Sequence, residues 1–542
     1  MESRLWTILS RSALAAGSLH VLAEALWYIA RRRAIRTMTA IHELPHLGEY
    51  HSSGRVSGNA VIAGGSIAGL ATAIICNKFF DRVIIIEPDS MAELKRTRVA
   101  QAEQIHAIHA ISLQILRRII PDFDSRVVKH GGRILKADSQ LQFGPTNIKY
   151  RPETVPETVF ISRLVLEEIL REYVQTIPTV EVIQGLVTGV TPDNTGQRIE
   201  RVTIQTKGVE TRTIEVETAL FADCSGPATI GIKLLEKAQG AKWGPYSKTT
   251  YDPKITYATT LIPVPDRLKD TLPIFTRKLD GYKSFAELGF LKTVIPLPEQ
   301  DDRMVCIIRS GDKLVCGIGE WNLPSGPARL QSFNDYIQQV DSVWQCATGE
   351  SLAEGDSNRV AVMDSLRMLQ VSLEESGTTP EFKFCKMGPC YKVGYADAPK
   401  PSNFIAIGDS FIRVNPTFAQ GISKAMVDVA SLNGSLLNTT LIPIMSTLTK
   451  KPEWNLPAGF SADMLARQTP RVIHMWELTK DSDYGRRGTE RVSGESSELG
   501  AFGRKYWRYL VQLASRDQDV AASVVQFVQL LAPPLDLVKV RL

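Results

Sequence analysis

The chain has 542 residues, of which 44% are apolar and 22% are charged, and its 63 basic and 58 acidic residues give a formal net charge of +5. These values are typical of a globular protein with two or three cooperating domains. The basic residues are spread along the chain without a dense, aromatic-rich patch, so nucleic-acid binding is not predicted. The seven cysteines have no CxxC spacing, which indicates reduced thiols in an intracellular protein, cytoplasmic or membrane-associated. We predict no metal site.

Residues 1–45 form an N-terminal extension in which the apolar stretch 5–30 precedes the basic sequence RRRAIR. The stretch contains Arg11, His20 and Glu24, and charges near the middle of a spanning helix are costly. Three alternatives therefore stay open: a helix packed on the protein, an amphipathic helix on a membrane surface, and, least favoured, a span. A cleaved secretory signal is not expected, because the positive cluster follows the apolar stretch.

The next stretch, GNAVIAGGSIAGLATAIICNKFFDRVIIIEPDS, predicts a strand, a tight turn, a helix and a second strand. Its turn comprises Gly64, Gly65, Ser66, Ala68 and Gly69. Glycines there permit close backbone approach, and the start of the following helix presents N–H groups to a pyrophosphate. Glu87 follows Gly64 by 23 positions, near the offset at which an acid binds the ribose of a dinucleotide. The alternative is an ordinary βαβ unit with a glycine-rich turn.

Polar residues follow this acid and are placed to meet the rest of a dinucleotide; they include Arg98, Gln101 and His106. A solvated loop is the alternative for each of them. An amphipathic helix then ends before Pro121, and a second one begins near Arg163. Short alternating strands lead to the sequence DCSG at 223–226. We assign residues 57–240 to the first part of a nucleotide-binding domain.

Residues 245–395 favour strands, at 254–264, 289–298 and 303–319, with a helix near 333–346. This block predicts a mainly β substrate domain inserted into the nucleotide-binding domain. Residues 396–440 return to that domain with NFIAIGDSFIRVNPTFAQGIS, a buried strand that ends on an acid, a loop, and a helix that begins near Gly421. Residues 441–542 are predicted to form a helical C-terminal region.

Together, AGGSIAG with Glu87, ISR around Arg163, DCSG and IGDSFIRVNPTFAQGIS resemble FAD-dependent monooxygenases of the para-hydroxybenzoate hydroxylase type, over roughly residues 57–540. The resemblance implies an α/β fold with a Rossmann-like FAD domain of the glutathione-reductase type. It implies the following cofactor-binding residues: Gly64, Gly65, Ser66, Ala68 and Gly69 at the pyrophosphate, Glu87 at the adenosine ribose, Arg98 and Arg163 along the phosphates and ribityl chain, Asp409 at the ribityl hydroxyls, Pro416 against the flavin ring, and Gly421 with Ile422 at the pyrimidine edge.

Three departures from the family pattern matter. Ser66 and Ala419 replace glycines, so slightly more room is expected near the cofactor. DCSG replaces the usual DG fingerprint that is associated with NAD(P)H handling, which leaves the identity of the reductant open.

The resemblance implies a monooxygenase that uses FAD, molecular oxygen and NAD(P)H, and that hydroxylates or epoxidises a lipophilic polyketide or terpenoid through a flavin C4a-hydroperoxide, as in secondary metabolite biosynthesis. The cofactor carries this chemistry, so no catalytic side chain is predicted. The alternatives are a reductase or oxidase of the same fold and a non-catalytic binding protein similar to lipid carriers. A flavin halogenase is disfavoured because no WxWxIP motif is present. The substrate and the oligomeric state carry no motif.

Overall fold

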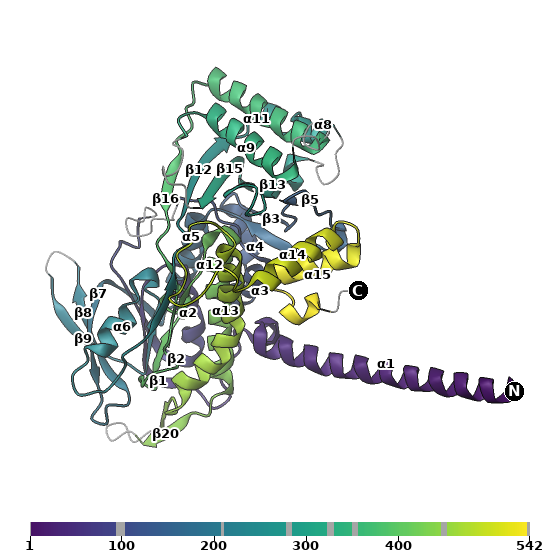
Figure 1. Cartoon of the computed structure of the whole chain (residues 1–542). Coiled ribbons are helices and arrows are strands. Elements are labelled where there is room, and N and C mark those ends of the chain that lie inside the picture. Colours follow the sequence, from purple (N-terminus) through teal and green to yellow (C-terminus); the bar gives the residue numbers. More distant parts are fainter. Residues whose placement is uncertain are drawn as a thin grey trace.

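The computed structural model describes residues 2–93, 103–207, 211–277, 284–321, 330–349, 356–445 and 452–538, with side chains from residue 18 onward except 444, 445 and 452. Two large sheets, each covered by helices, make up the body of the molecule (Figure 1). The predicted α/β class with an inserted, sheet-containing domain is confirmed.

The first sheet has seven strands in the order β18-β10-β1-β2-β7-β8-β9. The strands from β18 to β7 pair in parallel, and β8 and β9 add antiparallel strands at one edge. Their bounds are Phe404–Ala406 (β18), Leu220–Asp223 (β10), Val56–Ala63 (β1), Phe80–Glu87 (β2), Val180–Pro192 (β7), Ile199–Thr206 (β8) and Thr213–Glu217 (β9). The apolar run from Val83 to Ile86 is buried, as expected for a strand that is covered on both faces.

Helices cover this sheet and carry the residues that follow its strands. The bounds are Ile67–Phe79 (α2), Ala110–Ile119 (α3), Phe123–Lys129 (α4), Arg163–Gln175 (α5), Ile230–Glu236 (α6) and Gln420–Asn438 (α12). Helix α2 packs against both α12 and α5. Because α12 begins after β18 and α2 begins after β1, the two dinucleotide motifs are neighbours although about 340 residues separate them in the sequence.

The second sheet has the order β16-β12-β15-β14-β13-β4-β5. Its strands are Lys383–Lys386 (β16), Ile255–Pro263 (β12), Lys313–Trp321 (β15), Arg303–Ser310 (β14), Phe290–Ile295 (β13), Leu141–Phe143 (β4) and Thr146–Asn147 (β5). Helices α9 (Phe333–Thr348) and α11 (Ser357–Glu375) cover one face and enclose a separate apolar core (Figure 1). Strands β4 and β5 come from the segment assigned by sequence to the first domain, so the second sheet also recruits residues outside 245–395.

Smaller elements connect these layers. The further strands are Arg133–Lys136 (β3), Glu157–Phe160 (β6), Lys248–Tyr251 (β11), Cys390–Val393 (β17), Ile412–Arg413 (β19), Ile442–Met445 (β20) and Pro452–Asn455 (β21). The short helices are Asp266–Lys269 (α7), Pro273–Thr276 (α8), Ile41–His46 (η1), Pro152–Thr154 (η2), Gly226–Ala228 (η3), Phe285–Glu287 (η4), Gly408–Ser410 (η5), Pro416–Phe418 (η6) and Pro534–Leu537 (η7).

The C-terminal region is mainly helical, as predicted, with Phe460–Tyr484 (α13), Ala501–Ala514 (α14) and Gln518–Val528 (α15), and it also contributes the β20-β21 hairpin. Helix α13 packs along α12 and so joins the C-terminal region to the first sheet.

Helix α1 (Glu2–Met38) extends away from the body (Figure 1). Leu19 is 67% exposed, and among residues 18–38, whose side chains the structure describes, only Ala34 is buried. Arg31 forms an ion pair with Asp536 of η7 at 2.8 Å. The alternative in which this stretch packs on the protein therefore holds only for the end of α1. Among the residues that the structure describes, no helix has the length and apolar character needed to cross a membrane.

Candidate functional site

The glycine turn between β1 and α2 is closed by tight backbone contacts. Gly64 has φ +114°, and a Cβ on it would lie 2.5 Å from the carbonyl oxygen of Cys224. A Cβ on Gly69 would lie 1.8 Å from the carbonyl oxygen of Gly64. Both positions therefore require glycine, which brings the start of α2 against the end of β1, as the strand–turn–helix prediction implies.

Ser66 does not need the extra room that the sequence suggests. Its φ of −95° is ordinary for a residue with a side chain. Its hydroxyl donates to Oε2 of Glu167 at 2.7 Å and accepts from Nη2 of Arg163 at 2.8 Å. Glu167 is buried and also accepts from Arg171 at 2.6 Å. Residues of α5 therefore hold the side chain of Ser66, and Arg163 lies beside the turn.

Glu87 ends β2 beside the same turn and is 6% exposed. Its Oε2 accepts from the backbone N–H of Gly65 at 2.6 Å, and its Oε1 from that of Asp89 at 2.9 Å. Two backbone donors thus fix the position of the carboxylate at the end of β2. Ala68 faces the second motif, since a Cβ on Gly408 would lie 3.5 Å from its methyl group. Arg98 and Gln101 lie outside the described residues.

The sequence DCSG at 223–226 links the end of β10 to η5 (Gly408–Ser410) through hydrogen bonds. Oδ1 of Asp223 accepts from the hydroxyls of Ser225 and Ser410 at 2.6 and 3.0 Å, and Oδ2 accepts from Gly231 N at 2.7 Å. The hydroxyl of Ser410 in turn accepts from Gly226 N at 3.0 Å. Burial raises the pKa of Asp223, while these hydrogen bonds oppose that rise. Both oxygens of the Asp223 carboxyl group thus accept hydrogen bonds from other residues of the protein.

Asp409 lies beside a buried lysine that sequence reasoning missed. Nζ of Lys424 is 3.5 Å from Oδ1 of Asp409, is 0% exposed, and makes no hydrogen bond to a described residue. Asp428 accepts from Gly408 N at 2.8 Å, and burial raises its pKa to about 6. Asp409 is the most exposed of the three, with 31% of its side chain accessible. The sequence signal that could have indicated this site is Lys424 itself, a single lysine in a helix whose other residues are mostly apolar or small.

The loop before α12 places Pro416, Gly421 and Ile422. Ala419 has φ +55°, in the left-handed region, where the family pattern has glycine. A Cβ on Gly421 would meet no described atom within 4 Å, so the first turn of α12 borders open space. The unpaired N–H groups and the positive end of the helix dipole are therefore available to an anionic or electron-rich group.

Two histidines after the glycine turn are neutral near pH 7. His106 is half-buried, and burial together with the charge of Arg163 lowers its pKa to about 4. His109 is buried at the start of α3 (Nδ1 is 3.1 Å from the Ser423 hydroxyl of α12), and burial likewise lowers its pKa to about 4. Gln104 donates to the carbonyl oxygen of Lys383 at 3.1 Å. His106 is thus close to Arg163, whereas Gln104 contacts the second sheet.

The predicted residues in the described part of the chain fit FAD. The ends of β1, β2, β10 and β18 are adjacent in one parallel sheet, the arrangement at which such folds bind dinucleotides. This edge offers a glycine turn and helix N-terminus for phosphates, a fixed carboxylate for a ribose, the Asp409 and Lys424 pair for polyhydroxyl groups, and the open start of α12 for the flavin.

Two grooves lie away from this edge. One, of about 500 Å³, is lined by residues that include Trp243 and Lys400, and the other, of about 400 Å³, lies at the root of α1 between Arg36 and Arg467. Neither includes a predicted site residue, so both are set apart from the candidate site.

Metal binding is not supported at two places that could suggest it. The prediction of no metal site takes the histidines to lack HExxH spacing, and this premise is wrong, because the sequence HELPH at 42–46 matches HExxH. It forms a short 3-10 helix, and Glu43 is buried against Arg467 and Arg471. His130, Glu168 and Glu172 are the one group in the described part of the chain whose ligand atoms approach closely, and Arg126 and Lys129 already neutralise Glu172.

No protein-family model and no curated protein matches the sequence. Solved structures do. The flavin-dependent brominase Bmp2 aligns with a TM-score of 0.52 at 14% identity, over 88% of this chain and 94% of that one. PqsL, a probable FAD-dependent monooxygenase from Pseudomonas aeruginosa, aligns with a TM-score of 0.50 at 14% identity, over 84% and 99%. The chain has the fold of FAD-dependent monooxygenases. p-Nitrophenol 4-monooxygenase PnpA from Pseudomonas putida DLL-E4 aligns similarly, with a TM-score of 0.50 at 13% identity, over 88% and 99%. The resemblance inferred from the motifs is thus confirmed at the level of fold.

Proposed function

We propose that this protein is an FAD-dependent monooxygenase that hydroxylates or epoxidises a lipophilic small molecule of the polyketide or terpenoid type. The observation that carries the proposal is the convergence of Glu87, Arg163, Asp409 and the open start of α12 at one edge of the parallel sheet. Bound FAD, reduced by NAD(P)H, would supply the electrons that place one atom of O₂ in the substrate and release the other as water.

The residues of this chain would bind and orient the cofactor. Glu87 would accept hydrogen bonds from the adenosine ribose, and Arg163 would neutralise phosphate charge beside the glycine turn. The N–H groups at the start of α12 would stabilise negative charge on the flavin ring.

The second sheet meets the Pro416 loop at β15. A Cβ on Gly319 would lie 3.1 Å from Cγ of Met304 and 3.7 Å from the methyl group of Thr417, and a Cβ on Gly317 would lie 2.9 Å from the Ile105 side chain. The contact is apolar, which suits a lipophilic substrate and excludes water from the reacting centre.

The absorbance spectrum of the purified protein, followed by substrate-dependent oxidation of NADH and NADPH under ¹⁸O₂, tests the proposal. We expect a yellow protein whose flavin is released by acid precipitation, and one labelled oxygen atom in the product. Reductant consumption without label in the product would instead identify a reductase or oxidase of the same fold. A colourless, flavin-free protein would identify the non-catalytic binding protein.

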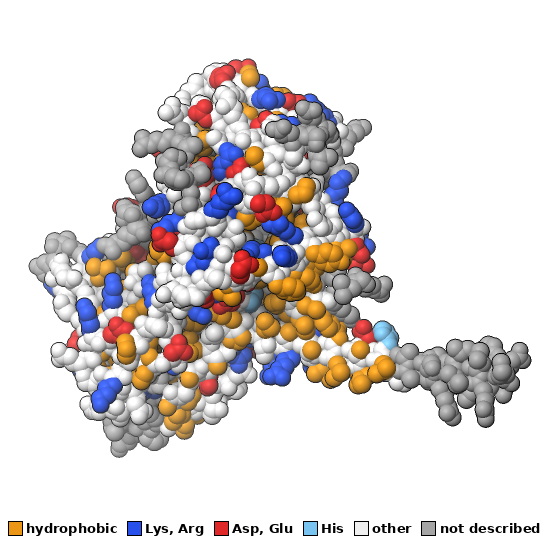
Figure 2. Space-filling view, in the orientation of Figure 1, with side chains coloured by type: hydrophobic (Ala, Val, Ile, Leu, Met, Phe, Trp, Pro, Cys, Tyr) orange, Lys and Arg blue, Asp and Glu red, His pale blue; other side chains and the backbone are white. Residues whose placement is uncertain are grey.

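We also propose that α1 docks on an anionic membrane surface, where a lipophilic substrate is available. Leu19, Leu22, Leu26 and Ile29 are more than half exposed and lie along one side of the helix. Arg32, Arg33 and Arg36, exposed in the same helix, complement anionic lipid headgroups. Apolar side chains on the body, at α14 and α15, continue toward the described part of α1 (Figure 2).

Flotation with phosphatidylcholine vesicles, with and without phosphatidylserine, tests this docking. We expect binding that requires the anionic lipid, weakens with salt, and is lost in the variant with serine at positions 19, 22 and 26. Binding that resists carbonate extraction would contradict surface docking. A protein that ignores both vesicles but forms an α1-dependent dimer would replace the membrane by a second copy of the chain.

A further inference from the structure

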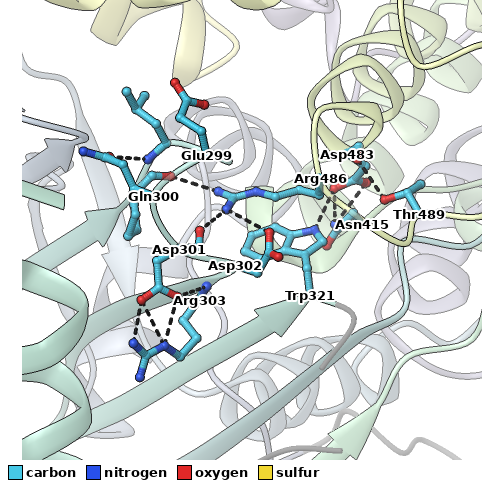
Figure 3. Close-up of polar contacts among 12 residues, drawn as sticks. Glu299, Gln300, Asp301, Asp302, Arg303, Trp321, Asn415, Asp483, Arg486 and Thr489 are labelled. Atoms are coloured by element: carbon cyan, nitrogen blue, oxygen red, sulfur yellow. Dashed lines mark hydrogen bonds and ion pairs between the residues drawn. The ribbon is translucent and has the colours of Figure 1, made fainter. Parts of the chain in front are cut away.

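The carboxylate of Asp483 joins four elements that lie far apart in the sequence. Figure 3 shows Asp483 with two of its partners, Trp321 and Asn415. Asp483 lies at the end of α13 and is 0% exposed. It accepts hydrogen bonds from the hydroxyl of Tyr251 at 2.9 Å, from Nε1 of Trp321 at 3.0 Å and from Nδ2 of Asn415 at 2.8 Å. Tyr251 ends β11, Trp321 ends β15 in the second sheet, and Asn415 precedes η6. All three partners are buried.

The set of partners favours the ionised carboxylate. An indole N–H and an amide NH₂ group only donate, so a proton on Asp483 would face donors. Both carboxylate oxygens are used, because Nδ2 of Asn415 also lies 3.1 Å from Oδ2. The titratable groups that face it are the guanidinium of Arg486, which is charged, and the phenol of Tyr251 and the thiol of Cys390, whose pKa values burial raises. Four hydrogen-bonding contacts thus take the place of a directly bound cation.

Arg486 holds the indole from its other side. Its guanidinium lies over the ring of Trp321 at 4.5 Å, donates to the carbonyl oxygens of Asp301 and Pro296, and pairs with Asp302 at 3.6 Å (Figure 3). The position of Trp321 is therefore set by the second sheet and its adjoining loop.

The remaining polar atom of Asn415 organises the Pro416 loop. Its Oδ1 accepts from the N–H of Thr417 at 3.0 Å and from the Thr417 hydroxyl at 2.7 Å, which caps the turn that contains Pro416. Because Asp483 binds the NH₂ end of this amide, the carboxylate fixes which way the amide points. A continuous set of hydrogen bonds therefore runs from β15 and β11 through Asp483 to the turn at Pro416.

We propose that Asp483 is a positioning residue of the candidate site, which holds the Pro416 loop of the cofactor domain at a fixed place against the substrate sheet. The inference depends on the proposed function in one respect, namely that the flavin ring lies against this loop. Removal of the carboxylate then changes the surroundings of the ring end of FAD and leaves the adenosine end unchanged.

Asp483→Ala, Asp483→Asn and Trp321→Phe are the test variants, and Glu43→Gln is the control. Glu43 is also buried and ion-paired, at the root of α1 and away from the site. The readouts are the Tm of the flavin-free protein and, after loading with FAD, the visible spectrum, the reduction potential and the Kd for FAD.

We expect Asp483→Ala to shift the visible spectrum and the reduction potential and to raise the Kd for FAD at least about tenfold. Asp483→Asn keeps one acceptor, and Trp321→Phe removes one donor, so both should produce smaller shifts in the same direction. Glu43→Gln should lower the Tm alone.

A lowered Tm in all Asp483 variants with wild-type spectrum, potential and Kd would overturn the proposal, because it would leave Asp483 a purely structural residue. If Asp483→Ala does not fold, Asp483→Asn and Trp321→Phe decide the question by the same readouts. A wild-type protein that binds FAD but transfers no labelled oxygen would refute the proposed activity while the spectral shifts still establish the positioning role. Absence of FAD binding in the wild type would refute both.

Discussion

Glu87 and Asp409 are the two carboxylates that the sequence assigns to sugar-like hydroxyl groups, and their surroundings differ. Glu87 is held by two backbone N–H groups, whereas Asp409 is partly exposed and lies 3.5 Å from a buried lysine. We expect Glu87→Ala and Asp409→Ala each to weaken FAD binding by about 1.5–3 kcal/mol, the range for hydrogen bonds to a charged group. Titration of apoprotein with FAD measures the change.

Glu87→Gln is the matched control, since it keeps an acceptor for Gly65 while it removes the charge. Its loss of affinity should be smaller than that of Glu87→Ala. Wild-type affinity in both alanine variants would contradict the assignment.

Ala419 has a backbone conformation that suits glycine better. A φ of +55° costs an L-residue roughly 1–2 kcal/mol relative to glycine. Glycine in turn lowers the free energy of unfolding by about 0.4–1 kcal/mol, because it increases the conformational entropy of the unfolded chain. We therefore expect Ala419→Gly to raise the free energy of unfolding by about 0.5–1 kcal/mol. Denaturant unfolding of the flavin-free protein measures this value, and a destabilised glycine variant would contradict the strain argument.

Burial raises the pKa of Asp483 to about 6, although hydrogen bonds from Asn415, Trp321 and Tyr251 oppose the rise. The unfolded value is near 3.9, so the folded protein holds the proton more tightly. The resulting stability is fully present below about pH 4 and is lost as the pH rises to about 6, a change of about 3 kcal/mol for two pKa units.

Asp483→Asn lacks this titration. We expect its Tm to rise relative to that of the wild type between pH 4 and pH 7, in a series of thermal melts at constant ionic strength. A difference in Tm that does not change across this range would show that Asp483 does not titrate there.

At the scale of elements, the start of α12 is the part of the candidate site that a variant can fill without disturbing the protein. No described atom lies within 4 Å of a Cβ on Gly421. Gly421→Val should therefore leave the Tm of the flavin-free protein nearly unchanged but weaken FAD binding and slow flavin reduction, because the side chain would occupy space proposed for the ring. If the side chain moves the ring out of reach of one N–H donor, the rate should fall by about 10²–10³.

Gly421→Ala, with one methyl group, is the graded control and should have an intermediate effect. Calorimetry and stopped-flow reduction with NADPH provide the two measurements. Unchanged flavin reduction in the valine variant would mean that α12 does not face the ring.

The elements that sequence predicts well are those whose signal is local. The strand–turn–helix at Gly64 and the buried strand before Asp409 depend on neighbouring residues, and both form as expected. Glu167 could not be found this way, because its role depends on contact with Ser66, which is 101 positions away. Asp483 reaches Tyr251 over 232 positions and has no pattern around it. Pairings of this kind are set by packing of whole elements, which composition and periodicity do not encode.

The same limit applies to the membership of sheets. β4 and β5 are too short to stand out, and they join the second sheet because the chain passes its edge. The orientation of α1 is another case, since the sequence favours a packed helix over a surface helix but excludes neither.

At the scale of the whole molecule, α1 is separable from the body. Residues 18–26 are exposed, whereas contact with the body is made later, by Arg31 with Asp536 and by the buried Ala34. Burial of apolar area on folding is therefore small for residues 18–26, and their removal should cost little stability. We expect a protein that begins at Trp27 to keep its Tm within about 1 °C and its affinity for FAD, but to lose binding to anionic vesicles. Thermal melts, FAD titration and vesicle flotation, each compared with the full chain, measure the three quantities.

The matched control is Arg31→Gln in the full chain, which breaks the ion pair with Asp536 and leaves the exposed apolar residues in place. This variant should therefore alter the Tm slightly and retain most vesicle binding. If the shortened protein instead unfolds or loses FAD, α1 stabilises the body, and the membrane-docking proposal would lose its basis.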